Sequence, residues 1–233
     1  MPPNLRRGDR PSRPEAAFTV TVDCPEMASI LIVCTGNICR SPMAEGLLRH
    51  HLRTREVGDV QVASAGVSGW DGSPASAEAV EALSERGVDI SSHLARRLGR
   101  GMIDSADLVV AMAAEHREGV ARIAHSAGPR TFTLKELVRL LDDVRMPLRG
   151  ATSEELLREA AELANTRRTG EQEALDEDIA DPLGLSLPAY RATAWELNGL
   201  VERLVEVLFG EGADRGGTAA GEAVDHRSAW EAR

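Results

Sequence analysis

A cysteine and an arginine at the two ends of a short loop are the residues of this chain best suited to chemistry. Cys34 follows an apolar run, Ile30 to Val33, which predicts a short buried strand. Arg40 is followed by Ser41 and Pro42, and proline suits the first turn of a helix. The residues between the thiol and the guanidinium are Thr35, Gly36, Asn37, Ile38 and Cys39. The sequence therefore predicts a strand, a loop and a helix N-terminus in direct succession.

This arrangement suits an anion the size of phosphate. Gly36 and Asn37 tolerate positive φ, so the loop can curl and point its backbone N–H groups inward. Such a loop at a helix N-terminus holds a dianion, and Arg40 can bind two phosphate oxygens at once. The same positive field favours a thiolate at Cys34, to which Ser41 can donate a hydrogen bond. We therefore expect Cys34 to attack a bound phosphate, although a buried structural cysteine at a strand–helix turn is the alternative.

The composition is that of a globular protein and narrows the classes of partner. The chain has 233 residues, of which 42% are hydrophobic and 27% charged. Its net charge of −10 argues against nucleic acid as a partner. No apolar run is long enough for a membrane span, and the N-terminus lacks the apolar core of a signal peptide. Three cysteines form no secreted disulfide framework, so we expect a cytoplasmic protein without membrane, metal or cofactor.

The hydrophobic pattern alternates between strand-like and helix-like segments. We expect strands at residues 30–33, 60–64, 107–111 and 130–133, and helices at 42–52, 75–86, 113–124, 134–141 and 188–209. This alternation predicts an α/β fold: a single three-layer domain with a parallel sheet of about four strands flanked by helices. The phosphate-binding loop follows the first strand.

The ends of the chain and one internal segment depart from this pattern. Residues 1–27 are rich in proline and arginine and are expected to be disordered, with Met27 as a possible start. The domain is expected to span 28–210, and the tail 211–233 to be disordered. Residues 142–178 interrupt the domain as an insertion that we expect to be exposed. Within it, Thr152 to Glu155 is a capping box for a helix that runs to about Asn165.

A second catalytic group is needed, because thiolate attack on a phosphate ester leaves an oxygen that must be protonated. Asp181 is the candidate, since Pro182 stiffens the turn that carries it ahead of a long helix. Several acidic residues precede Asp181, and an Asp-Pro pair by itself is only a turn signal.

A resemblance to a known family selects Asp181. The loop motif at residues 34–42, with the distal Asp181-Pro182, resembles the low molecular weight protein tyrosine phosphatases of bacteria. Three further segments are similar to patterns of that family: residues 64–66, 92–96 and 106–112. The resemblance covers about 28–141 and 179–209. It implies that Cys34 is the nucleophile, that Arg40 binds phosphate and the transition state, and that Asp181 acts first as acid and then as base.

The resemblance also implies supporting roles. Asn37 holds the strained loop and is supported by Ser64 and His93, while Ser41 stabilises the thiolate. Cys39 resembles a second loop cysteine that can trap oxidised Cys34 as a reversible disulfide, or it is a small packed thiol. Substrate contacts are expected from these residues: Thr35, Gly36, Asn37, Ile38, Cys39, Ser41 and Trp70.

The substrate side departs from the family pattern. The family often has aromatic residues just after Asp-Pro, where this chain has Leu183 and Gly184, and Trp70 is the candidate to replace that aromatic wall. We expect a phosphorylated protein as partner, a tyrosine kinase or one of its targets.

Three alternatives to a phosphotyrosine phosphatase remain. A phosphoarginine phosphatase of the same fold is favoured by Thr35 and the segment 131–135, but that subgroup resembles threonine where Ile38 stands. A thiol arsenate reductase would need resolving cysteines after Cys39, and there are none. A non-catalytic anion-binding module is disfavoured by the joint presence of Cys34, Arg40 and Asp181.

Overall fold

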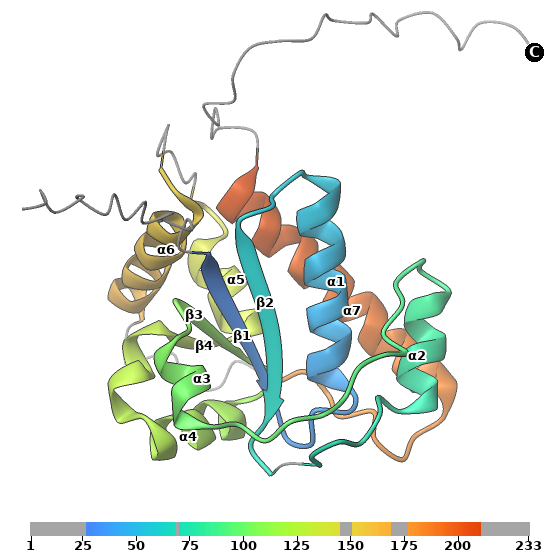
Figure 1. Cartoon of the computed structure of the whole chain (residues 1–233). Helices are drawn as coiled ribbons and strands as arrows, with labels where there is room; N and C mark the ends of the chain where they lie inside the picture. The colour runs from blue at the N-terminus through green and yellow to red at the C-terminus, as the bar shows by residue number, and fades with distance from the viewer. Residues whose placement is uncertain (1–26, 69, 145–150, 169–176, 211–233) are drawn as a thin grey trace, which may run out of the picture.

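One parallel sheet organises the molecule (Figure 1). The computed structural model describes residues 27–68, 70–144, 151–168 and 177–210. Four strands pair in the order β2–β1–β3–β4, and every pairing is parallel. The strands are β1 (Ala28–Cys34), β2 (Val60–Gly66), β3 (Leu108–Ala111) and β4 (Thr131–Thr133). The expected small parallel sheet is confirmed.

Helices cover both faces of the sheet, which confirms the three-layer arrangement. Ile30 and Ile32 of β1 face one core, and Leu31 and Val33 face the other. The larger core is shared with α1 (Arg40–Thr54), α2 (Ala77–Ser84), α5 (Leu134–Leu141), α6 (Ser153–Arg167) and α7 (Leu187–Phe209). The smaller core is shared with α3 (Arg100–Asp104), α4 (Ala114–Ile123) and the 3₁₀ helix η1 (His125–Arg130).

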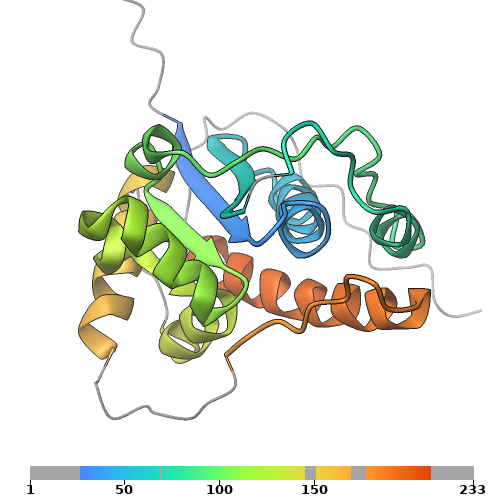
Figure 2. The same ribbon diagram turned by 90° about the horizontal axis from the view of Figure 1, so that it is seen from below.

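The C-terminal ends of the strands lie at one end of the sheet, which is the end seen in Figure 2. Cys34 pairs with Gly66 of β2, and Val33 pairs with Ala111 of β3, which in turn pairs with Thr133. Ligands bind at this end of open parallel sheets, because the loops after the strands gather there. The register therefore brings the loop after Cys34 close to the residues that follow β2 and β3.

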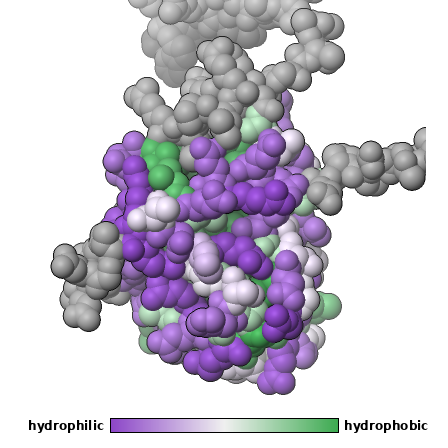
Figure 3. Space-filling model, turned by 90° about the vertical axis from the view of Figure 1, so that its left-hand side faces the viewer, coloured by the Kyte–Doolittle hydropathy of each residue, from purple (hydrophilic) through white to green (hydrophobic). Residues whose placement is uncertain are grey.

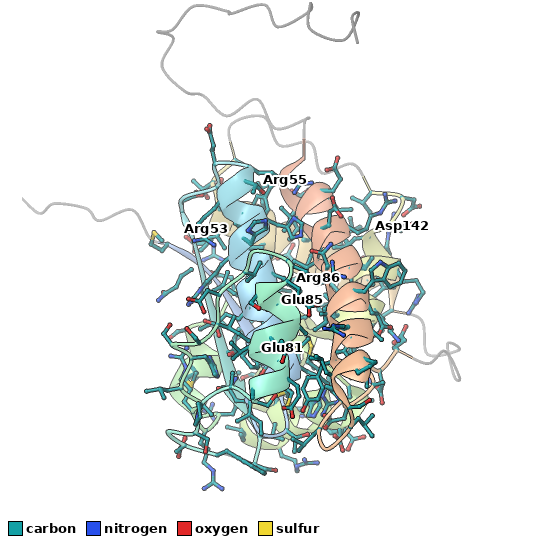
Figure 4. All side chains as sticks on the ribbon, turned by 90° about the vertical axis from the view of Figure 1, so that its right-hand side faces the viewer. Arg53, Arg55, Glu81, Glu85, Arg86 and Asp142 are labelled. Atoms are coloured by element: carbon teal, nitrogen blue, oxygen red, sulfur yellow. The ribbon has the colours of Figure 1, made fainter. Side chains whose placement is uncertain are left out.

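Three helices form the face on the right of Figure 1, where α1, α2 and α7 lie side by side (Figure 4). Exposed ion pairs connect them at the surface: Arg55 with Glu206 at 2.9 Å, and Arg191 with Glu85 at 2.5 Å. Such exposed pairs contribute little to stability. The attachment of α7 rests instead on its buried apolar face, which includes Leu197, Val201 and other residues: Ala194, Leu204, Val205 and Leu208.

The expected exposure of the 142–178 insertion is wrong for its helix. The predicted capping box at Thr152 is present, and α6 buries an apolar stripe made of Leu156, Leu157, Ala160, Ala161 and Ala164. This stripe packs into the larger core beside α5 and η1. α6 lies on the left-hand side of the molecule, whose surface is mainly hydrophilic (Figure 3). The many charged residues of this segment therefore suggested an exposed insertion, although its helix is part of the domain.

A buried carboxylate fixes the end of α6 to α5. Glu136 is 3% exposed and pairs with Arg117 at 3.0 Å and with Arg168, just after α6, at 2.8 Å. Its carboxylate also accepts the N–H of Thr133 to complete the cap of α5. The Arg168 guanidinium lies over the ring of Phe132, 4.3 Å from its centroid. One carboxylate therefore connects β4, α4, α5 and the insertion.

Replacing Glu136 with alanine is expected to lower the free energy of unfolding by about 2–4 kcal/mol, because two guanidinium groups lose a buried partner. Urea unfolding monitored by circular dichroism measures the change. Asp142→Ala is the matched control, since Asp142 pairs with Arg203 at the surface and should cost less than about 1 kcal/mol. Equal losses in the two variants would contradict the role given to Glu136.

Some elements were missed or displaced, and some expectations lie outside the described residues. α3 and η1 are too short to show a period in the sequence, and α1 begins at Arg40 rather than Pro42. The expected disorder of 1–26 and 211–233, and most of the acidic run from residue 171, falls outside the residues described. In the part that is described, no helix is both long and apolar enough to cross a membrane.

Candidate active site

The thiol of Cys34 lies at the end of β1 and receives hydrogen bonds from its own loop. Its Sγ is 2.9 Å from Ser41 Oγ and accepts the backbone N–H of Asn37 at 3.2 Å. The Ser41 hydroxyl also accepts from Asn37 Nδ2 at 2.9 Å, so its proton is free to point at the sulfur. Two hydrogen-bond donors, the Ser41 hydroxyl and the Asn37 N–H, are therefore within reach of the one sulfur.

The loop is held open by Asn37, which has a φ of 58° and is fully buried. Its side-chain amide donates to Ser64 Oγ at 2.8 Å and accepts the backbone N–H of Arg96 at 3.0 Å. The backbone carbonyl oxygen of Asn37 is 2.8 Å from His93 Nε2. The structure therefore places the two expected supporting residues, Ser64 and His93, directly against the left-handed residue of the loop.

Behind this network lie Glu45, which the sequence did not single out, and two residues to which it gave no role, Arg96 and Gly66. Glu45 is 5% exposed and accepts the Ser64 hydroxyl proton at 2.5 Å. Arg96 donates from Nε to the Ser64 carbonyl oxygen at 3.0 Å. Gly66 is required by close approach, because a Cβ there would lie 2.7 Å from the Thr35 carbonyl oxygen. The signal available for Glu45 was its position one turn after Ser41 on the same helix.

Arg40 and Asp181 are in direct contact, although 141 positions separate them in the chain. Arg40 Nη2 donates to Asp181 Oδ2 at 2.5 Å and to Thr35 Oγ1 at 3.2 Å, and Nη1 donates to the Ile179 carbonyl oxygen at 3.1 Å. The Arg40 side chain is 5% exposed and that of Asp181 is 42% exposed. The predicted acid thus lies beside the predicted phosphate ligand, at the mouth of the loop.

The segment that carries Asp181 is anchored from several sides. Ile179 N–H donates to the carbonyl oxygen of Met112 at 2.8 Å, and Met112 directly follows the end of β3. The Asp178 carboxylate caps α4 by accepting the Ala114 N–H at 2.8 Å, and Lys135 Nζ donates to the Asp178 carbonyl oxygen at 2.7 Å. These contacts fix the position of Asp181 relative to the loop between Cys34 and Arg40.

A cavity of about 70 Å³ opens between the loop and this segment. Trp70 and Leu183 line it from outside the loop and are 49% and 48% exposed, and Ile38 of the loop also lines it. The rest of the lining is Cys34, Thr35, Gly36, Cys39, Arg40 and Asp181. The expected aromatic wall at Trp70 is therefore at the cavity. Among the described residues, no group of three or more His, Cys, Asp or Glu side chains could hold a metal.

Cys39 lies at the inner side of the cavity and is 3% exposed. Its thiol is 3.4 Å from Ser76 Oγ and 3.5 Å from the Tyr190 hydroxyl of α7. Burial raises the pKa of the Cys39 thiol, so Cys39 is kept protonated while Cys34 carries the donors. The two cysteines of the loop thus have different environments.

His116 is a residue of the site that sequence reasoning missed. It is fully buried in the first turn of α4, and its Nε2 is 2.8 Å from Thr35 Oγ1. Burial, with the nearby charge of Arg40, lowers the pKa of His116 to about 4, so the imidazole is neutral near pH 7. The available signal was its position just after β3, because such residues gather at the same end of a parallel sheet as Cys34.

Comparison of the sequence with models of protein families shows to which family the chain belongs. Residues 29–178 match the family described as low molecular weight phosphotyrosine protein phosphatase. The chain belongs to this family. It is accordingly a phosphoric monoester hydrolase, and the family acts on phosphorylated proteins.

Named relatives and solved structures agree with this placement. A protein-arginine-phosphatase of Geobacillus stearothermophilus is 35% identical over 179 residues, which cover 77% of this chain and 95% of that protein. A probable low molecular weight protein-tyrosine-phosphatase, EpsP of Ralstonia solanacearum, is 43% identical over 117 residues, covering 49% and 77%. A YwlE arginine phosphatase mutant with a phosphorylated active site serine superposes with a TM-score of 0.59 at 32% identity, covering 78% and 97%.

Proposed function

We propose that this member of the family hydrolyses phosphotyrosine in proteins through a phosphocysteine at Cys34. The observation that carries the proposal is the joint placement of Cys34, Arg40 and Asp181 around one cavity with apolar walls. A related phosphatase whose active site serine carries phosphate supports a covalent intermediate on this scaffold.

In the first step the Cys34 thiolate attacks phosphorus, and the bond from phosphorus to the tyrosine oxygen breaks. The proton of the Asp181 carboxyl moves to the leaving oxygen, so tyrosine departs neutral. The phosphoryl oxygens replace Asp181 as partners of the Arg40 guanidinium, which frees the carboxyl for this transfer. The N–H groups of the loop and Arg40 stabilise the charge that develops on phosphorus.

In the second step the Asp181 carboxylate takes a proton from water, and the resulting nucleophile attacks phosphorus of the phosphocysteine. The sulfur–phosphorus bond breaks, inorganic phosphate leaves, and the thiolate is regenerated with its donors from Ser41 and Asn37. The acid of the first step is the base of the second, so one side chain at the cavity mouth is sufficient.

Substrate choice is the part of the proposal that depends on the cavity walls. Trp70, Leu183 and Ile38 offer apolar surface to a planar phenyl ring, and none of them can hydrogen-bond to the outer N–H groups of a phosphoguanidinium. Phosphoarginine is the second candidate, favoured by the arginine phosphatase that this chain spans almost entirely. The apolar cavity walls favour phosphotyrosine as the substrate, whereas sequence identity to that relative favours phosphoarginine. We base the assignment on the walls.

Wild type is expected to prefer a phosphotyrosine peptide over the same peptide with phosphoarginine, and Ile38→Thr to shift the ratio of kcat/KM toward phosphoarginine. Ile38→Thr replaces an ethyl group by a hydroxyl, and a change of about this size in a pocket is worth about 10–200-fold. Phosphate release from the two peptides measures the ratio, and Ile38→Val is the matched control because it keeps an apolar branched side chain. A wild type that already prefers phosphoarginine would replace this assignment with the second candidate.

The working compartment follows from the same chemistry. We infer a reducing, cytoplasmic location, since both described cysteines are free thiols and turnover requires the Cys34 thiolate. The proposed partners are a tyrosine kinase or the proteins that it phosphorylates.

A further inference from the structure

A buried histidine next to the phosphate loop has no role in the two steps above. His116 is fully buried, yet its Nδ1 has no hydrogen-bond partner in the part of the chain that the structure describes. Its other nitrogen, Nε2, lies 2.8 Å from Thr35 Oγ1 and 3.2 Å from Glu115 Oε1. A buried polar side chain with one orphaned atom is costly to keep, so its remaining contact deserves a functional account.

The contact joins the phosphate loop to α4, a helix far from it in the sequence. Thr35 is the first residue of the phosphate loop, and His116 belongs to the helix that follows β3. A carboxylate can only accept, so Glu115 favours the tautomer with the proton on Nε2, which then donates to the Thr35 hydroxyl. The Thr35 proton in turn is directed at Glu115 Oε1, 3.5 Å away. The hydroxyl is thereby held in one orientation.

The oriented hydroxyl faces the catalytic arginine. Thr35 Oγ1 accepts from Arg40 Nη2 at 3.2 Å, and this guanidinium also donates to Ile179 and Asp181, which belong to the acid segment. When phosphoryl oxygens replace Asp181, the Thr35 hydroxyl remains as the contact of Arg40 within its own loop. The orientation of the guanidinium in the transition state then depends on the oxygen that His116 holds.

We propose that His116 is a positioning residue for Arg40, acting through the Thr35 hydroxyl. His116 touches no substrate atom; it fixes the acceptor that aligns the guanidinium with the phosphoryl group. The proposal rests on the proposed function only for the roles of Cys34 and Arg40. It does not depend on whether the phosphate comes from tyrosine or arginine. The chain of contacts from His116 through Thr35 to Arg40, which we call the relay, acts on the phosphoryl group and not on the side chain that carries it.

The test compares His116→Leu with His116→Gln in the full-length protein, using p-nitrophenyl phosphate as substrate and vanadate as a mimic of the transition state. His116→Leu is expected to lower kcat/KM by about 10- to 100-fold, because a slightly misplaced arginine loses transition-state contacts. Vanadate inhibition should weaken by a similar factor. His116→Gln restores an N–H donor near the position of Nε2 and should recover activity close to wild type.

Two controls separate positioning from folding. Val120→Ala removes buried volume one turn further along the same helix and should lower thermal stability without lowering kcat/KM. Thr35→Val removes the relay oxygen, and the Thr35→Val, His116→Leu double variant should be no less active than Thr35→Val alone. Additive losses, no rescue by glutamine, or an equal loss in Val120→Ala would overturn the proposal. A wild-type preference for phosphoarginine would contradict the substrate assignment and leave these ratios unchanged.

Discussion

Cys34→Ser is expected to lose hydrolysis of an aryl phosphate by about 10⁴-fold or more, the largest effect that any substitution in this chain should produce. A neutral hydroxyl is a far weaker nucleophile than the thiolate that the proposed mechanism requires at Cys34, even with Ser41 Oγ and the Asn37 N–H at 2.9 and 3.2 Å. Steady-state release of p-nitrophenol in the presence of EDTA measures the loss. Wild type should keep its full rate in the same buffer.

Two outcomes would contradict the thiolate mechanism. One is residual turnover in the serine variant close to that of wild type, and the other is loss of wild-type activity when EDTA is added. Cys39→Ser is the matched control, since it changes a second thiol of the same loop that the mechanism does not use as nucleophile. It should retain turnover under reducing conditions.

Asp181→Asn is expected to lower kcat for a phosphotyrosine peptide by about 10²–10⁴-fold, because an amide can neither protonate the leaving oxygen nor activate water. The effect should depend on the leaving group. p-Nitrophenol leaves without a proton, so the first step with its phosphate ester is spared while the second step remains slow. Rapid mixing should therefore show a burst of about one nitrophenolate per enzyme, followed by slow turnover.

The exposed Asp104, on α3, provides the control for a charge change away from the site, and Asp104→Asn should behave as wild type. Absence of a burst in Asp181→Asn, with equal losses for both substrates, would show that another group protonates the leaving oxygen. The acidic residues on the same segment, Glu177 and Asp178, would be the next to test.

The sequence was most informative where local pattern and chemistry coincide. The apolar run at residues 30–33 and the loop from Cys34 to Arg40 identified the first strand and the phosphate-binding loop, because both depend on neighbours in the chain. The distance between Asp181 and Arg40 could not be read from spacing, and only the family resemblance selected that acid among its neighbours. The contact at 2.5 Å depends on the anchoring of residues 178 and 179 to the end of β3 and to α4 and α5.

Two features escaped prediction for physical reasons. The apolar stripe of α6, with Leu156, Leu157 and Ala160 among its members, repeats at helical spacing, but the dense charge around it indicated a solvated segment. His116, on α4, was missed because its partner, Thr35, is on the phosphate loop, and the two meet only through the register of β1 and β3. Networks that cross between elements leave little trace in a single sequence.

The chain contains one tyrosine, and its placement affects how the enzyme can be studied and regulated. Tyr190 is 1% exposed, burial raises its pKa to about 12, and its hydroxyl is 3.5 Å from the Cys39 sulfur. A kinase cannot reach this hydroxyl without unfolding α7, so the folded enzyme carries no tyrosine for feedback phosphorylation. An antibody against phosphotyrosine, applied to an inactive variant recovered from cells, would therefore report captured substrate alone.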